Sequence, residues 1–113
     1  MDIGELRERL GNDETLVVDV LRLFLEDCPT HLGAIEAAVT ARRLDAVRSI
    51  AHTLKGSAAT LSAFGVAEAA AKLEVIAERQ EVATLDSQLA TLVDEVERLV
   101  AELRGLNDIA IAG

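Results

Sequence analysis

The chain has few aromatic residues and no long apolar run, and each absence excludes a class of protein. Trp and Tyr are missing and only two Phe occur in 113 residues, so the core is expected to be aliphatic. The period-two alternation of half-buried strands is hard to find. No apolar run approaches the roughly 20 residues that span a bilayer, and no basic segment followed by an apolar one opens the chain. We therefore expect a soluble, cytoplasmic, helical protein.

The chain also lacks the cysteine, histidine and glycine patterns that are typical of disulfide frameworks, metal sites and nucleotide-binding loops. Cys28 is the only cysteine, which excludes a disulfide framework and a CxxC pair, so we expect it to be a small packed residue. His31 and His52 lack the HExxH spacing and matching cysteines of a metal site, and we expect no metal and no cofactor held by the chain. Neither GxxxxGK[ST] nor GxGxxG occurs, so the nucleotide loop of a kinase is missing.

The chain is strongly acidic overall, but its charged residues are unevenly distributed along the sequence. The formal net charge of −9 argues against a nucleic-acid partner, because such binding needs clustered cations. Yet no Asp or Glu occurs from Ala46 through Ala67, a stretch that contains Arg48 and Lys55. This segment is therefore predicted to form a locally cationic surface suited to an acidic docking site, with chance segregation of charge as the alternative.

Apolar spacing predicts an all-α fold. A short helix with Ile3, Leu6 and Leu10 ends at Gly11-Asn12, and Asn12 or Asp13 caps the next one. That second helix runs from about Glu14 to Asp27, and Cys28-Pro29 is expected to interrupt it and start a third. The helix that contains His52 is predicted to end near Ser62, and the next helix follows a turn in which Gly65 adopts backbone dihedrals that other residues resist. The last helix is predicted over 85–103, with Gly105 ending it. Short connections then favour an antiparallel up-and-down four-helix bundle with small N-terminal helices, forming one domain over 1–105 with an unassigned tail at 106–113.

One helix carries a histidine outside its apolar stripe. Apolar residues at positions 44, 47, 51, 54, 58 and 61 follow the 3,4,3,4,3 spacing of a buried face. At about 100° per residue, His52 points away from this stripe toward solvent. Arg48 precedes it and Lys55, Gly56 and Ala59 follow it on the same side. Gly56 costs about 1 kcal/mol relative to Ala inside a helix, which suggests that a partner approaches the backbone there.

The segment His52-Thr53-Leu54-Lys55-Gly56-Ser57-Ala58, followed by Leu61, Ala63 and the Leu73-Glu74 pair, resembles the signature of histidine-containing phosphotransfer (HPt) domains of phosphorelays. Thr60 stands where Asn is frequent in that family and Ser62 where Gly is frequent. The resemblance covers nearly the whole chain and implies a helical bundle.

The resemblance also implies a function and a set of site residues. His52 is expected to accept a phosphoryl group from a receiver domain's aspartyl phosphate and pass it to another receiver, which supplies the divalent metal. The chain is then a phosphocarrier without autokinase activity. A monomer is expected on separate grounds, because the bundle is packed all round and has no sustained exposed apolar seam. Lys55 is expected to stabilise the phosphoryl group and Glu74 to bind the other ring N–H. Helical geometry, independently of the resemblance, places Arg48, Gly56 and Ala59 beside His52 as the expected docking surface.

Two alternatives follow from the same residues. The first is the dimerising phosphoacceptor domain of a sensor kinase, although Thr53 stands where that family typically has an acidic residue. The second is an interaction bundle that docks through the Gly56–Ala59 surface without chemistry. The sequence identifies neither the donor nor the acceptor, nor the direction of phosphate flow, nor whether the domain is freestanding.

Overall fold

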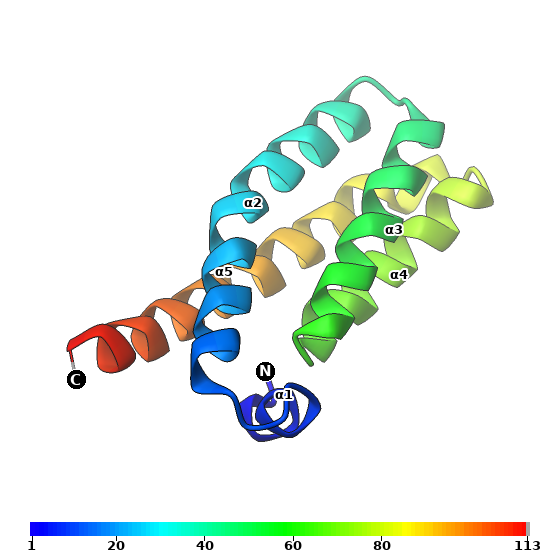
Figure 1. Ribbon diagram of the computed structural model, residues 1–113. Helices are drawn as coiled ribbons and strands as arrows, with labels where there is room; N and C mark the ends of the chain where they lie inside the picture. Colours follow the sequence, from blue (N-terminus) through cyan, green and yellow to red (C-terminus); the bar gives the residue numbers. More distant parts are fainter. Residues whose placement is uncertain (113) are drawn as a thin grey trace.

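The computed structural model describes the backbone of residues 1–112 and the side chains of residues 1–105, and within this range every regular element is helical. Four long antiparallel helices form an elongated bundle that measures 46 × 22 × 17 Å, with a short helix near one end (Figure 1). The all-α bundle predicted from the apolar spacing is confirmed. The elements are α1 (Ile3–Arg9), α2 (Glu14–Thr40), α3 (Leu44–Thr60), α4 (Phe64–Glu78), the 3-10 helix η1 (Val82–Thr84) and α5 (Leu85–Ala112).

The four long helices pack in a closed ring. Each packs against its neighbour in the chain, most extensively α3 against α4, and α5 returns to α2. The α3–α4 side of the bundle is therefore opposite the α2–α5 side. This arrangement decides which surfaces a partner can reach at the same time.

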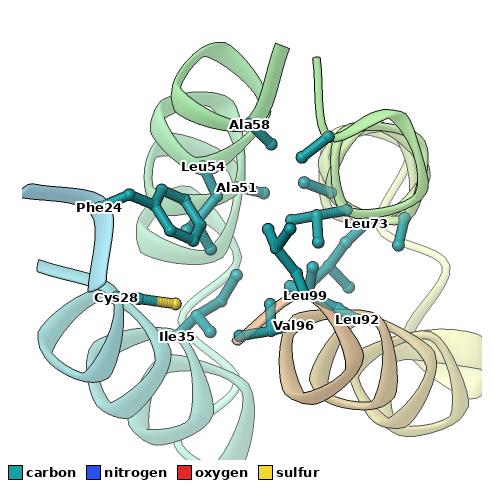
Figure 2. Packing of buried hydrophobic residues seen from close by; sticks show 14 of the residues in the cluster. Phe24, Cys28, Ile35, Ala51, Leu54, Ala58, Leu73, Leu92, Val96 and Leu99 are labelled. Carbon is teal, nitrogen blue, oxygen red and sulfur yellow. The ribbon is translucent and has the colours of Figure 1, made fainter. Parts of the chain in front are cut away.

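The core is aliphatic, as expected from the near absence of aromatic residues. Figure 2 shows Leu54 from α3, Leu73 from α4 and Leu92 from α5 converging on the bundle axis, each at most 1% exposed. Phe24 and Cys28 of α2 complete the layer beside them. Cys28 is 3% exposed and burial raises its thiol pKa, so the interpretation of Cys28 as a packed residue is confirmed.

Helix α2 corrects the prediction that Cys28-Pro29 separates two helices. The helix continues through Pro29 to Thr40, although proline inside a helix removes one backbone hydrogen bond at a cost of about 3 kcal/mol. Phe24 and Cys28 before Pro29, and Ile35 and Val39 after it, all face the same core. Burial of both halves on one surface outweighs the lost bond, so the second and third predicted helices are one.

Helix α5 corrects a second boundary. The helix passes through Gly105 and extends to Ala112, so Gly105 does not end it. Gly105 is exposed, and nothing lies within 4 Å of the position that a Cβ would take. A single glycine costs an α-helix only about 1 kcal/mol, which the rest of α5 tolerates. The division into a domain over 1–105 and a tail stays a prediction, and the side chains from 106 onward lie outside the described residues.

The connections between helices rely on left-handed backbone conformations. Asn12 has φ 59°, and the Asp13 carboxylate accepts a hydrogen bond from the Leu16 amide at 3.1 Å, so Asp13 is the cap of α2. In the α3–α4 connection Ser62 has φ 56°, whereas Gly65 lies in the first turn of α4. The prediction that Gly65 supplies the unusual dihedrals is therefore wrong, because Ser62 supplies them.

Ser62→Gly is expected to stabilise the protein by about 1 kcal/mol. Ser62 combines a positive φ with a fully buried hydroxyl that bonds to no described residue, and each feature costs roughly 1 kcal/mol or more. Glycine removes both costs but adds entropy to the unfolded chain. Urea unfolding followed by far-ultraviolet circular dichroism measures the change. Ser62→Ala removes only the hydroxyl, so equal effects of the two variants would contradict a contribution from the backbone.

Candidate functional site

His52 lies on the outer surface of α3, near the middle of the helix. Val47, Ala51 and Leu54 face the core, each at most 1% exposed. The His52 side chain is 69% exposed, which confirms the orientation predicted from helical geometry. The ring is therefore accessible to a second protein without any rearrangement of the bundle.

Glu74 of α4 joins His52 to Lys55. The His52 Nδ1 lies 2.8 Å from one Glu74 carboxylate oxygen, and the Lys55 ammonium lies 2.6 Å from the other. The Glu74 side chain is only 16% exposed, so this carboxylate lies in the seam between α3 and α4. The contact predicted between Glu74 and the histidine ring is present, and Lys55 is fixed by the same group.

The charges of Glu74 and Lys55 determine which ring nitrogen of His52 carries a free lone pair. The hydrogen bond from Lys55, and then the one from His52, lower the pKa of Glu74 below its ordinary range. Glu74 is therefore ionised at neutral pH and accepts a hydrogen bond from Nδ1–H of His52. In a neutral imidazole the proton on Nδ1 leaves Nε2 with a lone pair. The surface around His52 is thus less uniformly cationic than α3 alone suggests, because α4 contributes this carboxylate.

The pH dependence of stability is expected to change in Glu74→Gln. Because the pKa of Glu74 is lowered from 4.5, its ionised form adds stability that is fully present above pH 4.5 and is lost as the pH falls through the lowered value. The glutamine variant cannot lose this contribution, so its stability should fall less between pH 5 and about pH 3. Urea unfolding at several pH values measures this difference. Glu78→Gln, an exposed change on the same helix, is the control, and parallel profiles for Glu74→Gln and wild type would contradict the assignment.

The other predicted docking residues lie around His52 on α3. Arg48 is exposed one turn before it, Gly56 is exposed one turn after it, and Ala59 is half-buried further along. A Cβ added to Gly56 would meet nothing within 4 Å. The bundle itself therefore does not require glycine at this position, which leaves the approach of a partner as a reason for it.

Arg9 is a neighbour of this surface that sequence reasoning missed. Its guanidinium donates hydrogen bonds to the backbone oxygens of Ala59 at 2.8 Å and Thr60 at 3.2 Å, and it pairs with Glu5 at 2.6 Å. Arg9 thereby connects α1 to the end of the helix that carries His52. The i,i+4 spacing of Glu5 and Arg9 was a visible signal for their ion pair. No local pattern indicated the contact with α3.

His31, the other histidine of the chain, is half-buried in the middle of α2. Within the part of the chain that the structure describes, no three His, Cys, Asp or Glu side chains are grouped as a metal site would need. None of the described helices combines the length and apolar character needed to cross a bilayer.

Comparison with known families supports the resemblance. Residues 19–104 match the Hpt domain family, so the match begins within α2, contains α3 and α4 and most of α5, and leaves α1 outside it. Comparisons with curated proteins and with solved structures found no match. Domains of this family carry phosphoryl groups in phosphorelays and interact with receiver domains. Because this match spans more than half of the 113 residues and contains the exposed His52, the chain belongs to the Hpt domain family.

Proposed function

We propose that His52 is the phosphoacceptor of a carrier that takes a phosphoryl group from one receiver domain and passes it to another. The observation that carries this proposal is the 2.8 Å contact between Nδ1 of His52 and the Glu74 carboxylate. It supports a fixed tautomer in which Nε2 is the nucleophile. The proposal includes a monomeric carrier that acts in the cytoplasm.

The transfer step requires little from this chain beyond orientation. The Nε2 lone pair attacks the phosphorus of the receiver's aspartyl phosphate, a P–N bond forms, and the P–O bond to aspartate breaks and leaves a carboxylate. The ring gains positive charge during this step, and the Glu74 carboxylate opposite Nε2 stabilises that charge while Nδ1 keeps its proton. The reverse sequence delivers the group to the next receiver. Positioning and electrostatics therefore account for the role of His52 and Glu74.

Lys55 adds a cation beside the ring. Its ammonium lies 2.6 Å from Glu74, and its side chain is 36% exposed, so it can also approach phosphoryl oxygens on the solvent side. Arg48 adds a second positive charge on the same face. A receiver site rich in carboxylates meets a surface of complementary charge, which favours rapid association at low salt.

Direct labelling tests the proposal. The protein is incubated with a phosphorylated receiver domain, and the product is analysed by 31P NMR and by 15N NMR of the histidine rings. We expect one phosphoryl group, labile in acid and stable in base, bonded to Nε2 of His52. A label on another residue, or no label with a panel of receivers, would refute the function. A label on Nδ1 would refute the role of Glu74.

Gly56→Ala is expected to separate stability from transfer. The added methyl group has open space around it, and alanine favours a helix interior by about 1 kcal/mol, so the free energy of unfolding should rise by up to that amount. The same methyl group protrudes where the receiver approaches, so transfer should slow. Gly33→Ala on α2 also has open space around the added methyl group and is the control. Unchanged transfer in the bulkier Gly56→Leu would contradict a docking role for this position.

A further inference from the structure

A shallow apolar groove runs between α2 and α5, on the side of the bundle opposite α3 and α4. It consists of two cavities of about 320 and 430 Å³, and Glu97 lines both, so they adjoin. The floor is made of aliphatic side chains that stay partly in contact with water although they belong to the two helices that flank the core. These are Leu25, Leu32, Leu89, Val93 and Val100.

The rim of the groove is predominantly acidic. Glu36 from α2 and Asp86, Asp94 and Glu97 from α5 line it, against a single cation, Arg104, at one end. Asp86 is paired with Arg42 and Asp94 with Arg98.

Glu36 and Glu97 differ from the two paired aspartates. Both are exposed, and neither forms an ion pair with another side chain in the range 1–105. The groove therefore offers two carboxylates without a partner above an aliphatic floor.

The groove and the phosphoryl site face in opposite directions. His52 and Glu74 belong to α3 and α4, whereas the groove belongs to α2 and α5, and the bundle core separates the two sides (Figure 2). A receiver docked on His52 would leave the groove open. The proposed transfer also makes no use of it.

We propose that this groove docks a basic amphipathic helix from another protein. Such a helix places apolar residues at i, i+3, i+4 and i+7 on the floor, and its flanking Lys and Arg meet the acidic rim. The α2 stretch from Leu25 to Thr40 is about 22 Å long at 1.5 Å per residue, so it accommodates a helix of about four turns. The charge of the rim selects the cationic partner.

A second copy of this chain fits the groove poorly. Two such surfaces would bring four unpaired carboxylates, Glu36 and Glu97 of each copy, together against two Arg104 guanidinium groups, and each chain carries a net charge of −9. Like charges at an interface without matching cations oppose association. The occupant is therefore a partner of opposite charge.

A designed peptide provides the test. The probe is an 18-residue helix of Leu and Lys, with Leu on one face, titrated into the 15N-labelled full chain at low salt. We expect saturable binding with shift changes confined to residues 25–40 and 86–104. The double variant E36K/E97K should bind at least tenfold more weakly. E8K/E78K, with the same change in net charge at exposed positions elsewhere, should stay within about threefold of wild type.

The controls distinguish docking from general attraction between opposite charges. A peptide with Ser in place of Leu keeps the charge, and it should not bind. Equal weakening in both double variants, binding of the Ser peptide, or shift changes spread over α3 and α4 would overturn the proposal. Self-association of the unliganded chain through residues 25–40 and 86–104 would also overturn it, because the groove would then be a dimer interface.

Discussion

His52→Gln is expected to abolish phosphoryl uptake, whereas His31→Gln should leave it at the wild-type level. The amide of glutamine has no nucleophilic nitrogen lone pair, so no P–N bond forms even when the receiver docks normally. Glutamine has a similar size and polarity at a position that is 69% exposed, so the fold should be unaffected. The chain has only two histidines, which makes His31 the natural control.

The experiment measures transfer from a phosphorylated receiver over time. We expect no label above background on His52→Gln, which corresponds to a loss of at least 1,000-fold and to more than about 4 kcal/mol in transition-state stabilisation. Circular dichroism verifies that the variant is folded. Label that persists on His52→Gln but disappears in His31→Gln would move the phosphoacceptor to α2. Unchanged label in both variants would refute His52 as the phosphoacceptor.

This prediction rests on a feature that the sequence alone could establish. The apolar residues of α3 repeat with helical period, so the direction in which His52 points followed from rotation angles. Its exposure therefore needed no knowledge of the other helices. The helical class of the chain was predictable for the same reason, because amphipathic periodicity is a local property.

Contacts between helices were less accessible to sequence reasoning. The pairing of Glu74 with the His52 ring was expected only from resemblance to the family, and the second contact of Glu74, with Lys55, was not expected. Which face of α4 meets α3 depends on the packing of the whole bundle. Arg9 illustrates the same limit, because its partners Ala59 and Thr60 are 50 and 51 residues away.

The prediction of a helix boundary at Pro29 was wrong for a different reason. The prediction followed the low helix propensity of proline. The apolar positions nevertheless keep the spacing of one continuous stripe through the proline, at 17, 21, 24, 28, 32, 35 and 39. A break would normally shift the phase of this pattern. The uninterrupted phase was the signal that α2 continues, and tertiary burial outweighed propensity.

Leu73→Ala is expected to reduce the free energy of unfolding by about 3 kcal/mol, within the 2 to 5 kcal/mol range of fully buried leucines. Leu73 is 0% exposed and lies between α3, α4 and α5 in Figure 2. Its removal leaves a cavity that neighbouring aliphatic side chains only partly fill. Val75→Ala on the same helix is the control, because Val75 is 40% exposed and should change stability by no more than about 0.5 kcal/mol.

The same pair of variants separates the scaffold from the site. Leu73 is adjacent to Glu74 in the chain, yet its side chain points into the core while the carboxylate points to His52. A small domain with about 5 to 15 kcal/mol of stability stays mostly folded after the loss, so phosphotransfer at low temperature should be nearly normal. Urea unfolding and transfer kinetics are compared on the same samples. If transfer falls in proportion to the stability that is lost, the His52–Glu74 geometry depends on core packing rather than on its own hydrogen bonds.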